Sequence, residues 1–302
     1  MLIYRNRKEN KNIIYYKVII ILFNVMIFLK IVFIYKNIKK KLKVCLCTIG
    51  KKENLYIKEF VEHYRKIGYN KIFLYDNNDL NGERFEDVIQ KEINEGFVSV
   101  INYRGYKKCQ LLSYIDCYKN NKLKYDWISF FDIDEFLELK PPNLNVQDFL
   151  GDIKFYKCQN IKINWVFYYK NSLYYENKPL EKKNNYIIYA NKHIKSTVRG
   201  NLPTNYWNSE GNPHSSFEKF TSCSSSGKII DYQSPYNDPP DTSFAILKHY
   251  QYKSFEEYCI KLNKGKADNL NENFKKILNK FYEENKSNKE KVKIMKKIFK
   301  IH

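Results

Sequence analysis

The sequence lacks the cysteine pattern of a small protein held together by metal ions or disulfide bonds. Its seven cysteines are an odd number, and no two of them are separated by two residues. This excludes a zinc ribbon, which needs paired C-x-x-C ligands, and argues against a disulfide scaffold. Cys45 and Cys47 lie two positions apart in an apolar run, where small buried side chains are expected. The cysteines therefore favour a reducing compartment.

Acidic residues are scarce at both ends of the chain, so its charge is unevenly spread. The 302 residues include 53 Lys and Arg against 33 Asp and Glu, for a net charge of +20. Residues 1–43 account for +10 and residues 261–302 for +8, which leaves +2 for residues 44–260. A nearly neutral middle excludes a folded domain built to bind a nucleic-acid backbone, and no RNA- or DNA-binding motif is present. We therefore expect no nucleic-acid partner.

One long hydrophobic run lies near the N-terminus. Residues 13–35 are apolar apart from Lys17, Asn24 and Lys30, and as a helix they would span about 35 Å. No small-residue cleavage site follows, which favours an uncleaved transmembrane anchor over a signal peptide. A helix lying on the membrane surface is the alternative. Because lysines and arginines flank both ends of the run, the positive-inside rule gives no orientation.

The C-terminal stretch has apolar residues at helical spacing among many lysines. This pattern predicts two basic amphipathic helices within residues 274–301. They would either lie on anionic lipid or pack one face on the folded domain. The expected organisation is a basic segment over 1–12, an anchor over 13–35, a domain over 43–268 and a helical tail over 269–302.

The middle of the chain alternates short apolar strands with amphipathic helices. Strands are predicted over residues 43–49, 71–75, 97–101 and 127–131, and helices over residues 53–67, 82–93 and 107–121. Helices of this length between strands predict right-handed crossovers and a parallel sheet covered on both faces. The expected fold class is α/β, with ligands bound beyond the carboxyl ends of the strands.

Polar residues follow three of the predicted strands. They are Thr48 with Glu53, the run Asp76-Asn77-Asn78, and the run Asp132-Ile133-Asp134-Glu135. Two carboxylates two positions apart at a strand end point the same way, and together they can hold Mg²⁺ or Mn²⁺, which in turn bridges a diphosphate. Such a pair is common by chance, but this one follows a buried aromatic strand in an alternating α/β order. It is the sharpest functional signal in the chain.

The order of motifs resembles glycosyltransferase family 92 and the glycosyltransferase-2-like group. The likeness covers about residues 43–268 and rests most on the blocks WISFFDIDEFLEL and ILKHYQYKSFEEYCIKLNKGKAD, with NWVFYYKNS, KHIKSTVRGN and NPHSS between them. The resemblance implies a GT-A fold, which is a Rossmann-like, mostly parallel sheet. It also implies inverting transfer of a sugar from a nucleotide-diphosphate donor.

The resemblance further implies roles for single residues. Asp134, with help from Asp132, would ligate Mn²⁺ or Mg²⁺, and His249 would complete the metal shell or contact the phosphates. The residues expected to bind the donor are Thr48, Glu53, Asp76, Asn77, Gln110, Asp132, Glu135, Lys195 and Lys253. One carboxylate would take the proton of the acceptor hydroxyl, and the candidates for this general base are Glu181, Glu218 and Asp231. His214, in the NPHSS block, is either a site residue or a turn residue.

The implied partners are a nucleotide-sugar donor, a glycan or lipid-linked acceptor, and a membrane crossed once. The catalytic domain would face the compartment that holds nucleotide sugars, which is the cytoplasm in a bacterium and the Golgi lumen in a eukaryote.

Two other function classes stay open. One is a phosphotransferase of the haloacid-dehalogenase type, although Phe136 stands where those enzymes have Thr or Val, and their aspartate pair follows the first strand. The other is a non-catalytic, basic, membrane-anchored binding protein. Release of a nucleoside diphosphate in the presence of Mn²⁺ would separate the three classes.

Overall fold

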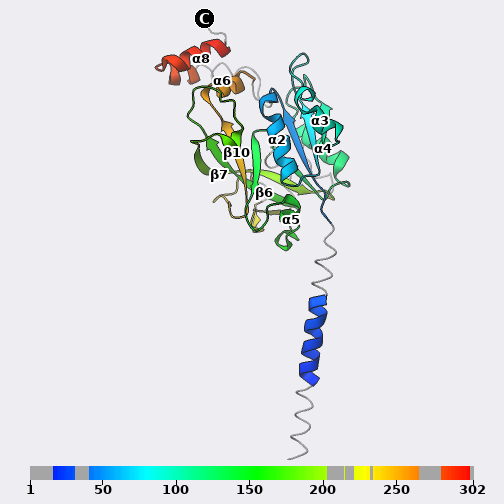
Figure 1. Ribbon diagram of the computed structural model, residues 1–302. Coiled ribbons are helices and arrows are strands. Elements are labelled where there is room, and N and C mark those ends of the chain that lie inside the picture. Colours follow the sequence, from blue (N-terminus) through cyan, green and yellow to red (C-terminus); the bar gives the residue numbers. More distant parts are fainter. Residues whose placement is uncertain are drawn as a thin grey trace, which may run out of the picture. The chain divides into compact units, whose positions relative to one another are not determined.

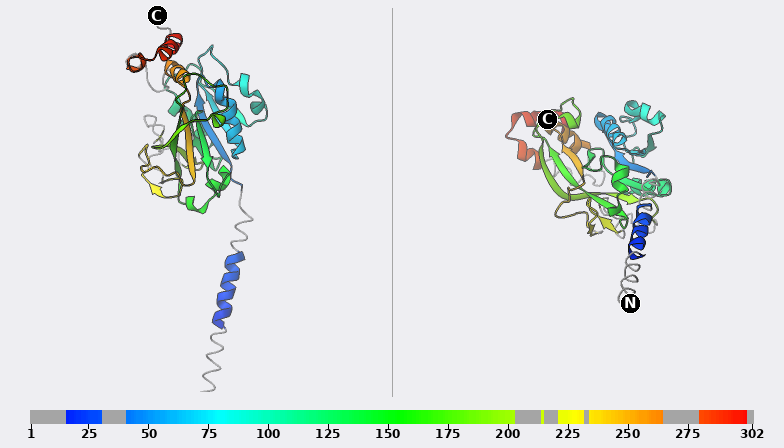
Figure 2. Two further views of the ribbon diagram at one scale, coloured as in Figure 1. Left: turned by 60° about the vertical axis from the view of Figure 1, so that its left-hand side comes forward. Right: turned by 60° about the horizontal axis from the view of Figure 1, so that its bottom comes forward.

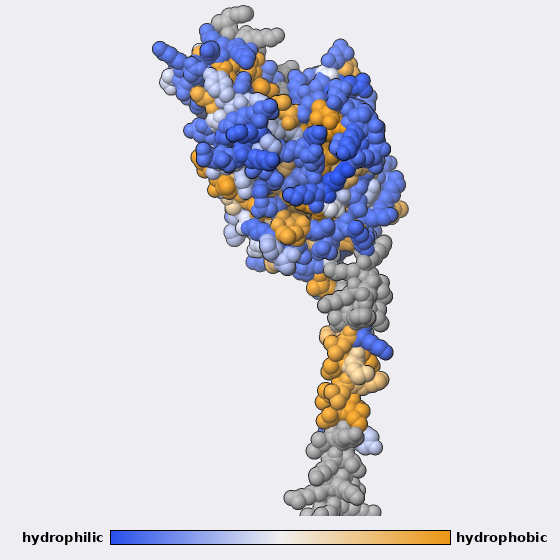
Figure 3. Space-filling view, in the orientation of Figure 1, coloured by the Kyte–Doolittle hydropathy of each residue, from blue (hydrophilic) through white to orange (hydrophobic). Residues whose placement is uncertain are grey.

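The protein consists of two units, Met1–Lys41 and Leu42–His302. The computed structural model describes residues 16–30, 41–202, 214, 221–231, 234–264 and 280–299. In the first unit, residues 16–30 form a helix with exposed side chains, and Figure 3 shows that most of them are hydrophobic. No helix in the described residues is long and apolar enough to cross a membrane. Residues 1–15 and 31–35, which include both ends of the predicted anchor, lie outside the described residues.

The first half of the second unit follows the predicted alternation. Strands β1 (Val44–Gly50), β2 (Lys71–Asp76), β3 (Val98–Asn102) and β4 (Trp127–Phe130) alternate with helices α2 (Asn54–Lys66), α3 (Glu86–Asn94) and α4 (Gln110–Asn121) (Figure 1). The strands pair in parallel in the order β3-β2-β1-β4. The predicted parallel sheet is confirmed for these four strands.

Local sequence explains which face of α2 is buried and where the helix ends. Its buried stripe consists of Tyr56, Ile57, Phe60, Val61 and Tyr64, at the spacing of one helix face. Gly68 follows with φ +96°, a left-handed conformation that glycine adopts without strain.

Helix α3 begins four residues later than predicted. The guanidinium of Arg104 donates to the carbonyl oxygens of Asp79, Gly82 and Glu83 at 2.9, 2.9 and 3.1 Å. Because these carbonyls point at Arg104, they do not enter a helix, and the segment forms a loop instead.

The sheet continues with strands of mixed direction. β5 (Glu135–Leu139), β6 (Asn160–Tyr169), β7 (Ile187–Arg199) and β10 (Ala245–Tyr252) complete the order β3-β2-β1-β4-β7-β6-β10-β5. β7 is antiparallel to β4 and β6, whereas β10 is parallel to β6 and antiparallel to β5. The short strand β8 (Ser222–Cys223) pairs with the start of β6, and β9 (Ile229–Ile230) pairs with β8. The α/β sheet is therefore present as expected, with antiparallel pairings added in its second half.

Helices cover both faces of the first four strands. Val44 and Leu46 pack with the α2 stripe, whereas the alternate residues Cys45 and Cys47 pack with the α4 residue Tyr114. Both cysteines are fully buried, as the apolar run predicts.

Short helices connect the later strands, and two longer ones end the chain. The short ones are α5 (Val146–Leu150), η1 (Ile153–Phe155) and η2 (Leu180–Lys182), and the longer ones are α6 (Phe255–Lys264) and α8 (Lys289–Phe299). Ser254 caps α6: its hydroxyl accepts from the backbone N–H of Glu257 at 3.1 Å and donates to the side chain of Glu257 at 2.8 Å.

Helices α6 and α8 lie together at one end of the domain (Figures 1 and 2). Phe255 and Cys259 of α6 form a buried cluster with Ile294 and Met295 of α8. Of the two alternatives for the basic tail, packing on the domain is therefore confirmed for residues 289–299.

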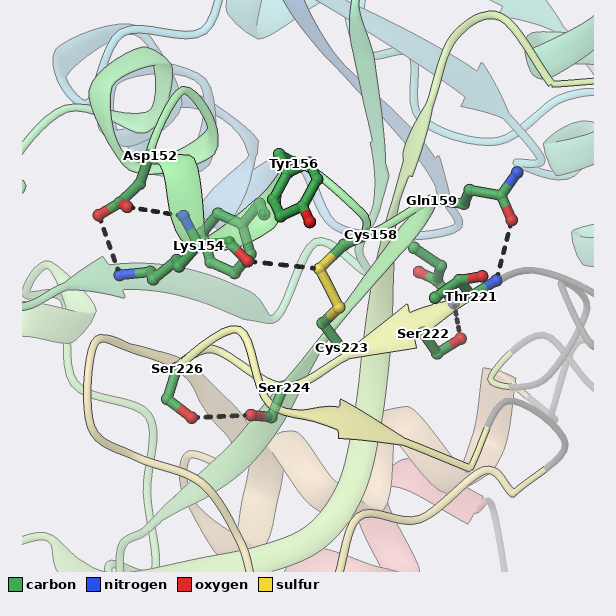
Figure 4. Close-up of a disulfide and its surroundings, with 12 residues drawn as sticks. Asp152, Lys154, Tyr156, Cys158, Gln159, Thr221, Ser222, Cys223, Ser224 and Ser226 are labelled. Carbon is green, nitrogen blue, oxygen red and sulfur yellow. Dashed lines mark hydrogen bonds and ion pairs between the residues drawn. A yellow bond between two sulfur atoms is a disulfide. The ribbon is translucent and has the colours of Figure 1, made fainter. Parts of the chain in front are cut away.

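A disulfide bond joins Cys158 to Cys223, 65 residues apart in the sequence. Cys158 precedes β6, and Cys223 lies in β8, which pairs with β6 (Figure 4). The argument against disulfide bonds fails for this pair, and the expected reducing compartment loses its support, because disulfides persist in oxidising compartments. The error arose because spacing along the chain does not show which strands the fold brings together. The free cysteines are buried: Cys45, Cys47, Cys109, Cys117 and Cys259.

Candidate active site

The Asp-x-Asp pair lies where β4 ends, at the carboxyl edge of the parallel strands. The backbone N–H of Asp132 donates to Oε2 of Glu135 at 2.9 Å, and the N–H of Glu135 donates to the carbonyl of Asp132 at 3.0 Å. This tight turn leads from β4 into β5. The N–H of Tyr250 in β10 donates to the carbonyl of Asp134 at 2.9 Å, so β10 also holds the turn in place.

Asp132 is surrounded by donors from α4 and β7. Its Oδ1 accepts from Gln110 at 3.0 Å and from Tyr114 at 3.1 Å, and its Oδ2 accepts from Lys195 at 2.8 Å. Burial alone would raise the pKa of Asp132, but the charge of Lys195 lowers it. The fold thus brings together four predicted donor-binding residues, Gln110, Asp132, Glu135 and Lys195.

Glu135 and Lys195 form a buried pair beside Asp132. Lys195 is 1% exposed and Glu135 is 0% exposed, with 3.8 Å between Nζ and Oε1. Burial raises the pKa of Glu135 well above its usual range, against the charge of Lys195. Burial would lower the pKa of Lys195, but the carboxylates of Asp132 and Glu135 raise it well above its ordinary value. Lys195 therefore stays charged and holds the carboxylate of Asp132 in place.

Asp134 faces a different set of side chains. Its Oδ2 lies 2.6 Å from Nζ of Lys261 in α6 and 3.6 Å from Nε2 of His249 in β10. Burial would raise the pKa of Asp134, but the charge of Lys261 and the neighbouring His249 hold it well below its usual range. Asp134 is therefore ionised at neutral pH. The predicted pair of Asp134 and His249, 115 residues apart in the sequence, is brought together.

The ring of His249 is packed between aromatic side chains. It stacks on Phe167 with 5.1 Å between ring centroids and lies 4.3 Å from the ring of Trp165. The residue is 5% exposed, and its Nδ1 has no hydrogen-bond partner among the described residues. Burial lowers the pKa of His249 despite the nearby Asp134. A neutral imidazole with Nε2 toward a carboxylate is suited to binding a metal ion.

Helix α6 supplies functional residues that sequence reasoning missed. Lys261 follows Glu257 by four positions and therefore lies on the same helix face. The hydroxyl of Tyr56 in α2 donates to Glu257 and accepts from Nζ of Lys183 at 3.3 Å. Lys253, a predicted donor-binding residue, lies over the ring of Tyr56, 4.3 Å from its centroid. The i, i+4 spacing of Glu257 and Lys261 could have indicated this face.

The ends of β1 and β2 carry buried polar atoms. Within the described part of the chain, Oγ1 of Thr48 and Nδ2 of Asn78 have no hydrogen-bond partner, and both residues are 0% exposed. Such atoms cost free energy unless something binds them. The predicted residues Asp76 and Asn77 have partners instead: Asp76 pairs with Arg104 at 2.7 Å, and Asn77 donates to the carbonyls of Tyr103 and Tyr106. They shape the loop beside the site.

Glu53 lies directly before α2 and supplies the carbonyl oxygen that accepts from the N–H groups of Tyr56 and Ile57. Burial would lower the pKa of Lys261, but the charge of Asp134 raises it above its ordinary value. The carboxylate of Glu53 contributes to the same rise. The predicted donor residue Glu53 is thus near α6.

The three carboxylates predicted as general bases lie elsewhere or outside the described residues. Glu181 is 3.7 Å from His63 and 3.9 Å from Lys248. Lys248 precedes His249 in β10, and successive side chains of a strand point to opposite faces, so Glu181 lies on the face away from His249. Asp231 is exposed, and its carbonyl accepts from a lysine of β6 at 3.0 Å. Glu218 lies outside the described residues.

His214 joins the site. Its Nδ1 lies 2.7 Å from the carbonyl of Ile194, and its ring meets the ring of Trp165 at 5.2 Å between centroids. Because a carbonyl only accepts, Nδ1 carries the proton and Nε2 is the accepting nitrogen. Burial, helped by the charge of Lys195, lowers the pKa of His214 to about 4. His214 is therefore neutral at physiological pH.

The lowered pKa of His214 predicts a pH-dependent stability. An unfolded histidine takes up its proton near pH 6.5, whereas His214 in the folded protein does so near pH 4, so the free energy of unfolding falls as the pH drops through this window. Relative to a His214→Asn variant, the wild type should lose about 2 kcal/mol between pH 8 and pH 5. Urea unfolding of both proteins measures this. A difference that stays constant with pH would contradict the lowered pKa.

A divalent cation fits two of the three predicted ligands. Asp134 and His249 offer a carboxylate oxygen and an imidazole nitrogen side by side, and the ammonium of Lys261 on Asp134 shows that this place attracts positive charge. Asp132 is held by Lys195. In the described residues, no three His, Cys, Asp or Glu side chains gather into a metal-binding group. The three predicted ligands are therefore not gathered into one group in the described residues.

The chain is similar to proteins of one family over most of its length. A family model described as glycosyltransferase family 92 matches residues 40–298. A glycosyltransferase family 92 protein of Ricinus communis is 30% identical over 110 residues, which make up 36% of this chain and 19% of that protein. Another from Arabidopsis thaliana is 29% identical over 102 residues, 32% of this chain and 16% of that protein. The matched stretches are less than a fifth of these relatives' length.

Two solved structures are similar to part of this chain. TarS from S. aureus in complex with UDP is 10% identical, with a TM-score of 0.43 over 74% of this chain and 64% of that one. A mannosyltransferase from Pyrobaculum calidifontis in complex with GDP-Man and Mn²⁺ is 7% identical, with a TM-score of 0.42 over 74% of this chain and 61% of that one.

Proposed function

The chain belongs to glycosyltransferase family 92 and is an enzyme of that class, and we propose that it transfers a sugar, with inversion, from a nucleotide-diphosphate donor to a hydroxyl group of a glycan or lipid-linked acceptor. Because the chain belongs to this family, the phosphotransferase and the non-catalytic binding protein are no longer candidate functions. The observation that carries the proposal is the convergence of Asp134, His249 and Lys261 at the carboxyl edge of the sheet.

The donor's nucleoside would lie against the ends of β1 and β2. Thr48 and Asn78 support this placement, because each keeps a buried polar atom that has no partner in the described residues. A base or ribose that bonded to these atoms would remove the cost of leaving them unpaired. The diphosphate would then lie near Lys253 and Lys261, whose ammonium groups are suited to phosphate oxygens.

Asp134 and His249 would hold Mn²⁺ or Mg²⁺ in this site. Such a cation, when bound, stabilises the negative charge that develops on the leaving diphosphate. Asp132 is kept ionised and oriented by Lys195, and it would contact the donor rather than the metal. Lys261, at the rim with a side chain 38% exposed, can turn from Asp134 to the phosphates.

We propose His214 as the general base among the described residues, although its pKa of about 4 makes it a weak one, and Glu218, outside the described residues, stays the other candidate. The tautomer of His214, set by the carbonyl of Ile194, makes Nε2 an acceptor for the proton of the acceptor hydroxyl. We expect His214→Asn to lower turnover by about 10²–10⁴, with little change in the KM for the donor, because donor contacts lie on other residues. Steady-state kinetics test this. A variant with normal turnover would show that another group takes the proton.

The experiment that tests the proposed function is a donor screen. The full chain is incubated with UDP- and GDP-sugars and Mn²⁺, and release of the nucleoside diphosphate is measured with and without added oligosaccharides. Release from at least one donor, absent in Asp134→Asn, is the expected result. If no donor yields a nucleoside diphosphate, the proposal is wrong.

Lys261 is expected to compete with the metal for Asp134. The ammonium lies 2.6 Å from the carboxylate oxygen, so a cation that binds there must displace it. Lys261→Met removes this competitor and should tighten Mn²⁺ binding by about tenfold. This factor corresponds to the loss of a partly buried ion pair that contributes roughly 1–2 kcal/mol. Titration calorimetry with Mn²⁺ alone measures it, and Lys119→Met, which changes an exposed lysine of α4, is the control. Unchanged or weaker binding would show that Lys261 and Mn²⁺ do not share this place.

Membrane attachment through residues 13–35 stays part of the proposal. It is supported by the exposed hydrophobic side chains of the helix over residues 16–30.

A further inference from the structure

A cavity of about 310 Å³ opens where β6 and β10 end against the C-terminal helices. Its walls include the tyrosines Tyr169, Tyr252 and Tyr258 and the polar residues Asn171, Glu284 and Asn285. We propose that this cavity binds sugar residues of a neutral oligosaccharide acceptor beyond the one that reacts. The inference rests on the proposed glycosyl transfer and names the acceptor's class and place.

A row of aromatic rings connects the cavity to the candidate active site. Trp165, Phe167 and Tyr169 occupy alternate positions of β6 and so share one face of the sheet. The ring centroids of Phe167 and His249, which stack, are 5.1 Å apart, and those of Tyr169 and Tyr252 are also 5.1 Å apart. The register pairs the same residues: His249 with Phe167, and Tyr252 with Tyr169. The rings therefore run from the metal-binding pair to the cavity wall.

The distance along this row decides the size of the ligand. His249 and Tyr252 pair with Phe167 and Tyr169, and the register shifts between them, so the advance is two residues of β6, or about 7 Å of strand. A single sugar at His249 would not extend that far, whereas an acceptor of several linked sugars would. The cavity would thus hold a residue of the acceptor that is remote from the reacting hydroxyl.

The chemistry of the lining favours a neutral saccharide. Ring faces such as that of Tyr258 pack against the apolar C–H face of a sugar, while amide and carboxylate groups bond its hydroxyls. The charged groups of the lining have partners within the protein: Lys170 pairs with Glu176 at 2.5 Å, Glu284 pairs with Lys280 at 3.8 Å, and Lys291 donates to Asn285 at 2.9 Å. Because these groups are engaged, the aromatic faces are the main feature that the lining offers a ligand. This favours a neutral saccharide over a polyanion or an anionic lipid.

Substitutions of Tyr258 can test the role of its ring in the cavity. Tyr258 stacks on Tyr252 with 3.8 Å between centroids, so Tyr258→Ser removes ring area from the cavity wall, whereas Tyr258→Phe keeps it. Tyr156 is 64% exposed and does not line the cavity, which makes Tyr156→Ser a matched control for loss of a surface tyrosine.

The test is binding of the full chain to an array of neutral and acidic oligosaccharides of one to six residues, together with anionic phospholipid vesicles. We expect some neutral oligosaccharide to bind at least tenfold more tightly than its terminal monosaccharide. Tyr258→Ser should lose this advantage, while Tyr258→Phe and Tyr156→Ser keep it.

Three outcomes would overturn the inference: no preference for chain length, a preference for acidic glycans or vesicles, or a length preference that Tyr258→Ser leaves intact. Its failure differs from failure of the proposed function, because wild-type protein that releases a nucleoside diphosphate from the donor alone still supports glycosyl transfer.

Discussion

Asp134→Asn will lower the rate of sugar transfer by at least about a hundredfold and leave the protein folded. Asparagine has nearly the same shape, so the turn between β4 and β5 keeps its backbone bonds, but the charge that faces Lys261 and His249 is lost. Because the pKa of Asp134 is held well below its usual range, the wild-type residue is charged at neutral pH and the variant differs in that charge. Kinetics with a nucleotide-sugar donor and a thermal melt of the same samples measure both effects.

Asp132→Asn provides the contrast for this prediction. Lys195 is 1% exposed, so loss of its partner at 2.8 Å leaves a buried ammonium facing Glu135 alone. The side chain of Asp132 is 31% exposed, so the cost should be smaller than the about 3–5 kcal/mol of a fully buried pair, but this variant should still lose stability as well as activity. Lys261, by comparison, has a side chain 38% exposed and can turn to water when Asp134 is changed. Near wild-type transfer by Asp134→Asn in EDTA would contradict the metal-binding role.

His249→Phe will abolish most transfer while keeping the melting temperature within a few degrees. The phenyl ring retains the contacts with Phe167 and Trp165, and no partner of Nδ1 in the described residues is lost. What disappears is Nε2, which faces Asp134 at 3.6 Å. The requirement for donor and for Mn²⁺ should rise together, because both depend on the same pair of ligands. Kinetics at varied donor and metal concentrations give the two requirements.

His249→Ala serves as the control for packing. It removes the same nitrogen but also leaves a hole between two aromatic rings, and the free energy of unfolding should drop by about 2–5 kcal/mol. The two variants together separate chemistry from packing. If His249→Phe transfers sugar at a normal rate, His249 is a packing residue, and the site at this end of β10 has to be withdrawn.

Much of the fold was predictable because it depends on neighbours in the sequence. The apolar stripe of α2, the stop at Gly68 and the strands over residues 71–75 and 97–101 follow from side-chain spacing within a few turns or residues. The Asp-x-Asp pair could be placed at a strand end for the same reason. The start of α3 was predicted too early because of Arg104. This residue donates to the carbonyl oxygens before the helix from 21 to 25 residues further along the chain.

By itself, the sequence determined the alternating strands and helices, the position of Asp132 and Asp134 beyond β4, and the order of motifs that resembles one glycosyltransferase family. These features are local, or are read as a linear order. The tertiary structure decided that Lys261, 127 residues from Asp134 in the sequence, pairs with the carboxylate of Asp134. It also placed Glu181 on the opposite face from His249 and brought Cys158 to Cys223. Such pairings depend on strand direction and register, and a one-residue change of register would turn every side chain of a strand to the other face.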